Sequence, residues 1–148
     1  MIKKVSSFLI VLLLLASTCF AYAPSPDKWE YVASDKSGNC LYVTKDPKNI
    51  KAYKNTLVIL TLAITPNGEG SYFIDEVIKN FHNDDHFYGN VVHHRAKWVF
   101  KDSHMLTKDF IPADENGRRV FYSVTDPWFK AEFDYAFKRA DELGLKYD

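Results

Sequence analysis

The sequence has few cysteines, no excess of charge of either sign and no apolar run long enough to span a membrane. Cys19 and Cys40 are its two cysteines among 148 residues, and a chain of this size needs no disulfide to hold its core together. The 19 basic residues equal the 19 acidic ones. A strongly basic face for nucleic acid is therefore not expected, and no nucleic-acid partner is predicted.

The N-terminal segment has the pattern of a secretory signal peptide. Lys3 and Lys4 precede an apolar run over 8–16, and Ala21-Tyr22-Ala23 is a small-x-small cleavage site. The apolar run is shorter than the ~20 residues that span a bilayer, so no integral membrane segment is predicted after cleavage. We expect a signal peptide at 1–23 and one domain at 24–148, exported to the periplasm, the cell surface or the medium.

Recognisable catalytic motifs are missing. The chain has no G-x-S-x-G elbow, phosphate-binding glycine loop, H-E-x-x-H or C-x-x-C. Cys40 follows Ser-Gly-Asn at the start of a predicted strand, without the helix N-terminus or neighbouring cation that lowers the pKa of a catalytic thiol. No catalytic residue and no cofactor are predicted, and we do not expect the protein to be an enzyme.

Apolar alternation and turn residues predict six strands, at 29–34, 40–45, 55–65, 91–101, 104–111 and 119–125. In the fourth, alternation places Val92, His94, Ala96, Trp98 and Phe100 on one face. Short turns between strands favour antiparallel pairing.

Two helices are predicted from a spacing of three and four residues. Ile74, Val77, Ile78 and Phe81 indicate a short helix at 72–82. The second begins with Asp126 as N-cap and Pro127 at the first helical position, and it ends at Gly144. Its apolar face consists of Phe129, Phe133, Ala136, Phe137, Ala140 and Leu143. The expected fold is α+β: a mainly antiparallel sheet of about six strands, a short middle helix, and a long C-terminal amphipathic helix packed on the sheet.

Four of the five histidines lie in "FHNDDHFYGNVVHHR", residues 81–95. His82 and His86 share a face on a continuous helix and could bind one metal, but the Asn and Asp residues between them favour a turn. His93 and His94 point to opposite faces of a strand. The hypothesis is a zinc site of His82, His86 and His94; the alternative is a solvated loop that leads into a strand.

Exposed aromatic residues are a second candidate feature. Phe87, Tyr88 and Trp128 fall at predicted loop or helix-end positions, where aromatic side chains often mark a partner surface. Ordinary packing against the sheet is the alternative reading.

Three stretches resemble the surface-adhesin protein E family of small exported bacterial proteins. They are "KWEYVASDKSGNCLYVTKDPKNI", "TLVILTLAIT" and "AKWVFKDSHMLTKDFIPADENGRRVFYS". The resemblance implies a small antiparallel sheet with a C-terminal helix, and a binding role rather than catalysis. The predicted function is an exported, adhesin-like binding domain with a protein partner at the cell envelope or host matrix. The alternative is a periplasmic metal-binding protein that uses the region from His82 to His94.

Overall fold

The computed structural model describes residues 23–82, 88–101, 104–110 and 119–148, as one curved antiparallel sheet and one long helix. The strands are β1 (Trp29–Ser34), β2 (Cys40–Thr44), β3 (Ile50–Tyr53), β4 (Thr56–Ile64), β5 (Glu69–His82), β6 (Tyr88–Lys101), β7 (His104–Phe110) and β8 (Tyr122–Ser123). A short 3-10 helix, η1 (Pro47–Asn49), precedes β3, and α2 (Pro127–Glu142) is the long helix.

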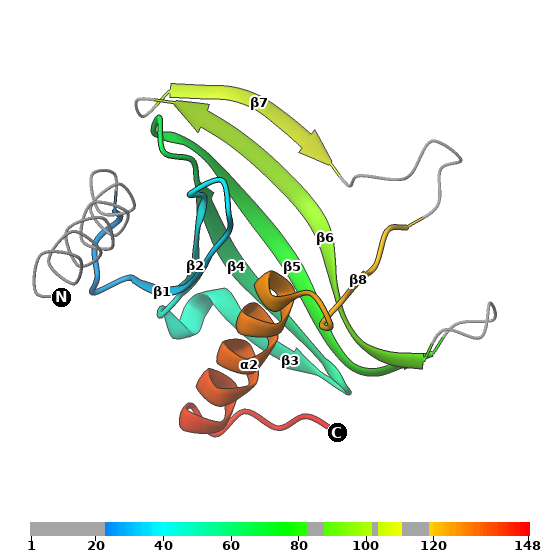
Figure 1. Cartoon of the computed structure of the whole chain (residues 1–148). Helices are drawn as coiled ribbons and strands as arrows, with labels where there is room; N and C mark the ends of the chain where they lie inside the picture. Colours follow the sequence, from blue (N-terminus) through cyan, green and yellow to red (C-terminus); the bar gives the residue numbers. More distant parts are fainter. Residues whose placement is uncertain (1–22, 83–87, 102–103, 111–118) are drawn as a thin grey trace, which may run out of the picture.

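The sheet is antiparallel throughout and has the order β1-β2-β4-β5-β6-β7, with β3 also paired to β4 and β8 to β6. It curves into a half-barrel, and α2 lies within the curve (Figure 1). We call the face that α2 covers the inner face and the opposite one the outer face. Val43, Ile59 and Val77 are inner residues, whereas Tyr42, Leu62 and Tyr72 belong to the outer face.

The predicted fold class is wrong for the middle of the chain. Residues 72–82 belong to the 14-residue strand β5, not to a short helix, and the sheet has eight strands rather than about six. The spacing of Ile74, Val77, Ile78 and Phe81 is helical, but it also fits a strand that is partly covered on both faces. Pairing with β4 along nine residues and with β6 on the other side favours the strand.

The C-terminal helix agrees with its prediction. The Asp126 side chain accepts a hydrogen bond of 2.8 Å from the backbone N–H of Trp128, and Gly144 follows the helix with a φ of +67°. Phe133, Phe137, Ala136 and Ala140 are buried against the inner face. Burial of a large apolar side chain such as Phe133 contributes about 1.5–3 kcal/mol, so this contact is the main core of the domain.

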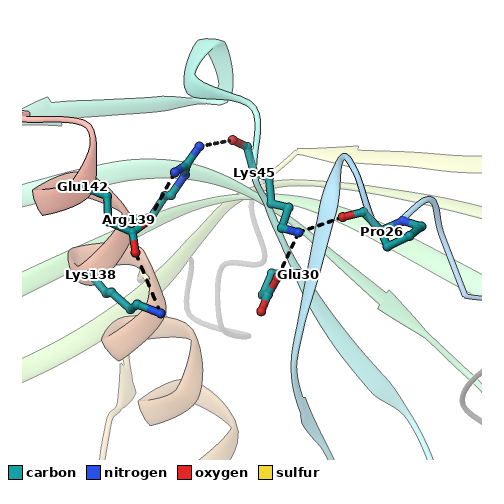
Figure 2. Close-up of polar contacts among 6 residues, drawn as sticks. All are labelled: Pro26, Glu30, Lys45, Lys138, Arg139 and Glu142. Atoms are coloured by element: carbon teal, nitrogen blue, oxygen red, sulfur yellow. Dashed lines mark hydrogen bonds and ion pairs between the residues drawn. The ribbon is translucent and has the colours of Figure 1, made fainter.

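Polar contacts fasten the C-terminal half of α2 to the ends of β1 and β2 (Figure 2). Arg139 donates a hydrogen bond of 2.9 Å to the carbonyl of Lys45, and its guanidinium lies 3.2 Å from Glu142. The ammonium of Lys45 donates to the carbonyl of Pro26 over 2.8 Å and lies 3.2 Å from Glu30. The helix therefore has a fixed position across the strands and not only an apolar contact with them.

A β-bulge at Arg95 changes which side chains of β6 share a face. Asp75 pairs with His94 but its neighbour Ile74 pairs with Ala96, so Arg95 is the extra residue. Beyond the bulge the alternation is reversed: Phe100 stacks on Tyr72 on the outer face, with ring centroids 4.9 Å apart. The prediction that Ala96 and Phe100 share the face of His94 is therefore wrong.

An aromatic stack covers one end of the outer face. Trp29 of β1 lies against Tyr72 of β5, with ring centroids 5.7 Å apart, and Phe100 of β6 lies on the other side of Tyr72. Gly70 faces the ring of Phe100 so closely that a methyl group there would overlap it. The stack joins strands from three separate parts of the chain.

Candidate functional site

A buried polar cluster lies on the inner face beneath α2. Asp75 of β5 and Glu132 of α2 are both fully buried. The Asp75 carboxylate accepts a hydrogen bond of 2.8 Å from the hydroxyl of Thr61, and its other oxygen is bonded to Nδ1 of His94. Because a carboxylate only accepts hydrogen bonds, His94 Nδ1 carries a proton in this contact.

Glu132 is the acid of this cluster that lacks a hydrogen-bond donor among the described residues. Burial raises the pKa of its carboxyl well above the ordinary value, and the neighbouring Asp75 charge raises this pKa further. A protonated Glu132 donates to Asp75, whereas two carboxylates cannot bond to each other. The neutral form of Glu132 is therefore the one that fits beneath the helix.

Aromatic rings enclose His94. Its imidazole stacks on Phe73 with ring centroids 4.3 Å apart, and Tyr122 and Phe129 lie at 5.1 Å and 5.9 Å. The side chain is 12% exposed. An Asp–His pair is a possible general base, but here the carboxylates and most of the imidazole are covered by core side chains. The arrangement favours a structural polar contact between the sheet and α2.

An open hollow of about 610 Å³ lies on the outer face. Its floor includes Val58 and Ile78, and its rim includes Tyr53, which is 67% exposed. Arg95 and Arg119 also line it, with guanidinium groups 3.7 Å and 2.8 Å from the carboxylate of Glu76. The volume lies in the range typical of small-molecule sites, and apolar and charged side chains meet there.

Arg119 is held in place by its neighbours. Besides the ion pair with Glu76, its Nε donates a hydrogen bond of 3.3 Å to Nε2 of His93, and the guanidinium lies 5.7 Å from the centre of the Phe121 ring. The Nδ1 of His93 is hydrogen-bonded to the carbonyl of Val120 over 2.9 Å. The side chain of Arg119 nevertheless stays 59% exposed, so part of its five-donor fork faces the hollow.

The structure separates the residues of the predicted zinc site. His82 lines the outer hollow, and His94 contacts Asp75 on the inner face. His86 lies outside the described residues. In the part of the chain that the structure describes, no group of three His, Cys, Asp or Glu side chains is arranged to hold a metal. The zinc hypothesis stays a prediction because it includes His86.

The other sequence candidates are also spread over the molecule. Trp128 lies in the first turn of α2 and is half-buried. Tyr88 begins β6, and Phe87 lies outside the described residues. Cys40 is 1% exposed and is disulfide-bonded.

Sequence reasoning missed both the buried acid pair and the outer hollow. For Glu132 a signal existed: it stands three residues after Phe129 and four before Ala136, within the apolar face of the helix. For the hollow the signal is weak, since Glu76 and Arg119 are 43 residues apart and the apolar spacing around Glu76 predicts a helix.

Within the described residues, no helix is long and apolar enough to cross a membrane. No protein-family model, curated protein or solved structure matches this chain.

Proposed function

We propose that this chain is an exported, non-enzymatic binding domain whose ligand contacts the outer hollow. One observation carries the proposal: Arg95, Arg119 and Tyr53 are all more than half exposed around a shared depression. Arginine and tyrosine are residue types that dominate binding energy at interfaces. The signal-peptide pattern at 1–23 supports export.

The inner cluster supports a binding role over catalysis. Its carboxylates are fully buried and its histidine is enclosed by three aromatic rings, whereas a general base must come within hydrogen-bond reach of a substrate proton. The outer hollow, in contrast, is lined by exposed side chains that a ligand can reach. This accessibility supports a binding surface on the outer face.

Site-specific photo-crosslinking in the producing cells tests this proposal. A benzoyl-phenylalanine at Tyr53 stands at the rim of the hollow, and one at Lys130, 60% exposed on α2, serves as the matched control. We expect a defined adduct from position 53 and none from position 130, identified by mass spectrometry. Equal adducts at both positions, or none at either, would contradict the proposed site.

A further inference from the structure

A second, smaller hollow continues the first along the outer face. It has a volume of about 200 Å³ and is lined by Leu60, Ile74, Lys48 and Lys51, and it shares Val58 with the larger hollow. Because Val58 lines both, the two hollows adjoin on the outer face over β3, β4 and β5, and we call them together the outer groove. Its floor is aliphatic along its whole length: Val58, Leu60, Ile74 and Ile78.

The charge along the outer groove is mainly positive. Lys48 and Lys51 stand at one end, and Arg95 and Arg119 at the other. Glu76 is the one acid among the described residues that line the groove, and both arginines share it. Two guanidinium groups on one carboxylate leave an excess positive charge and unused N–H donors that face outward.

On the basis of the proposed binding function, we propose that the outer groove binds an anionic amphiphile: an alkyl chain with a single carboxylate or phosphate headgroup. Arg95 and Arg119 hold the headgroup, because the planar guanidinium fork matches the oxygens of both groups. The chain lies over Val58, Leu60 and Ile74, because water leaves this aliphatic surface when the chain covers it. A neutral amphiphile has no charged headgroup to pair with the arginines, and a small anion has no alkyl chain to cover the aliphatic floor.

Calorimetric titration of the purified exported protein tests this. The probes, each below its critical micelle concentration, are decanoate, decyl phosphate and decyl maltoside, with acetate and inorganic phosphate as anions without a chain. We expect decanoate or decyl phosphate to bind at least tenfold more tightly than the neutral maltoside and the two small anions. Comparison of decanoate with decyl phosphate distinguishes a fatty-acid ligand from a phospholipid-like one. Equal binding of the maltoside, or no binding of either anionic amphiphile, overturns the proposal.

Matched variants locate the site. Arg95→Gln/Arg119→Gln removes two cations from the groove, and Lys130→Gln/Lys138→Gln removes two exposed cations from α2. We expect the first to weaken binding of the anionic probe at least tenfold and the second to leave it within twofold. Glu76→Gln frees both arginines from their acid and should tighten binding severalfold. Equal losses in the two double variants, with unchanged thermal unfolding, would overturn the assignment.

The outcome is distinguishable from failure of the proposed function. If position 53 yields its crosslink but no amphiphile binds, the outer hollow has a ligand of another class and this inference alone is wrong. If position 53 yields no crosslink, the proposed function fails.

Discussion

At the scale of single residues, Glu132 links stability to pH. Its pKa in the folded protein lies above that of the unfolded chain, so folding takes up a proton. The contribution of neutral Glu132 to the stability of the fold is fully present below the pKa of glutamate in the unfolded chain, about 4.3. It is lost as the pH rises through the pKa of Glu132 in the folded protein. The negative charge of Asp75 also raises the pKa of Glu132, so it adds to the effect of burial and does not oppose it.

Glu132→Gln should therefore raise the melting temperature at pH 8 and change it little at pH 4. The amide keeps the shape of the neutral acid and donates a hydrogen bond to Asp75 without titrating. Each unit of pKa displacement corresponds to about 1.4 kcal/mol, or roughly 5 °C for a domain of this size. Asp134→Asn, an exposed change on the same helix, is the control. An equal effect of Glu132→Gln at both pH values would refute the linkage.

Gly70 is the second residue with a specific consequence. A methyl group at this position would overlap the ring of Phe100, so Gly70→Ala should displace Phe100 from Tyr72 and lower the free energy of unfolding by about 1–3 kcal/mol. Urea denaturation measures the change. Ser71→Ala, one residue along the same strand, should cost clearly less; if the two variants are equally stable, Gly70 is not restricted by Phe100.

At the scale of elements, local signals predicted some segments well and others not at all. The start and end of α2 depend on Asp126, Pro127 and Gly144, which lie within or next to the helix. Both helix ends could therefore be predicted from the local sequence. The state of β5 depends on its two neighbours, β4 and β6, which lie elsewhere in the chain. The spacing of its apolar residues fits a helix, but it also fits a strand that is partly covered on both faces.

The bulge in β6 could not be predicted, because a bulge exists only relative to a partner strand. Glu132 could have been recognised on the apolar face of α2. Its neighbour Asp75 could not, since their contact requires the helix to lie on β5. The outer hollow could not be predicted for the same reason, because the ion pair between Glu76 and Arg119 joins two distant segments of the chain.

Deletion of Arg95 should test the bulge. It would remove the extra residue, while His94 stays on the inner face and Ala96, Trp98 and Phe100 keep their partners on the outer face. We therefore expect the deletion variant to fold and to lose about 0.5–3 kcal/mol in the free energy of unfolding, measured by urea denaturation. Arg95→Ala keeps the backbone register and should cost less than about 1 kcal/mol, since Arg95 is exposed. If the deletion variant does not fold, Arg95 is not the extra residue, and its loss has turned the side chains that follow it to the wrong face.

At the scale of the whole molecule, the two faces of the sheet differ in what covers them. The inner face holds the helix through an apolar core and the Asp75–Glu132 pair. The outer face carries the arginines and Tyr53, which the core does not need. We expect substitutions in the outer groove to change binding with little effect on folding, because exposed polar substitutions usually change stability by less than about 0.5 kcal/mol.

Export is the other prediction at this scale. Expression of the full sequence in a bacterium with a periplasm should yield a processed chain that begins at Pro24, since Ala21-Tyr22-Ala23 is the expected cleavage site. Intact-mass spectrometry of the periplasmic fraction measures it. A full-length chain in the cytoplasmic fraction would contradict the export prediction, and Ala23→Arg should block the cleavage.

The aromatic stack of Trp29, Tyr72 and Phe100 has an optical consequence. Closely spaced rings held at fixed angles produce a circular dichroism signal in the near ultraviolet, and the three rings of this stack come from β1, β5 and β6. Because the stack lies on the face opposite α2, this signal reports on the sheet without direct contact with the helix. An observer who follows it beside the far-ultraviolet helical band can thus see whether sheet and helix melt together or one after the other.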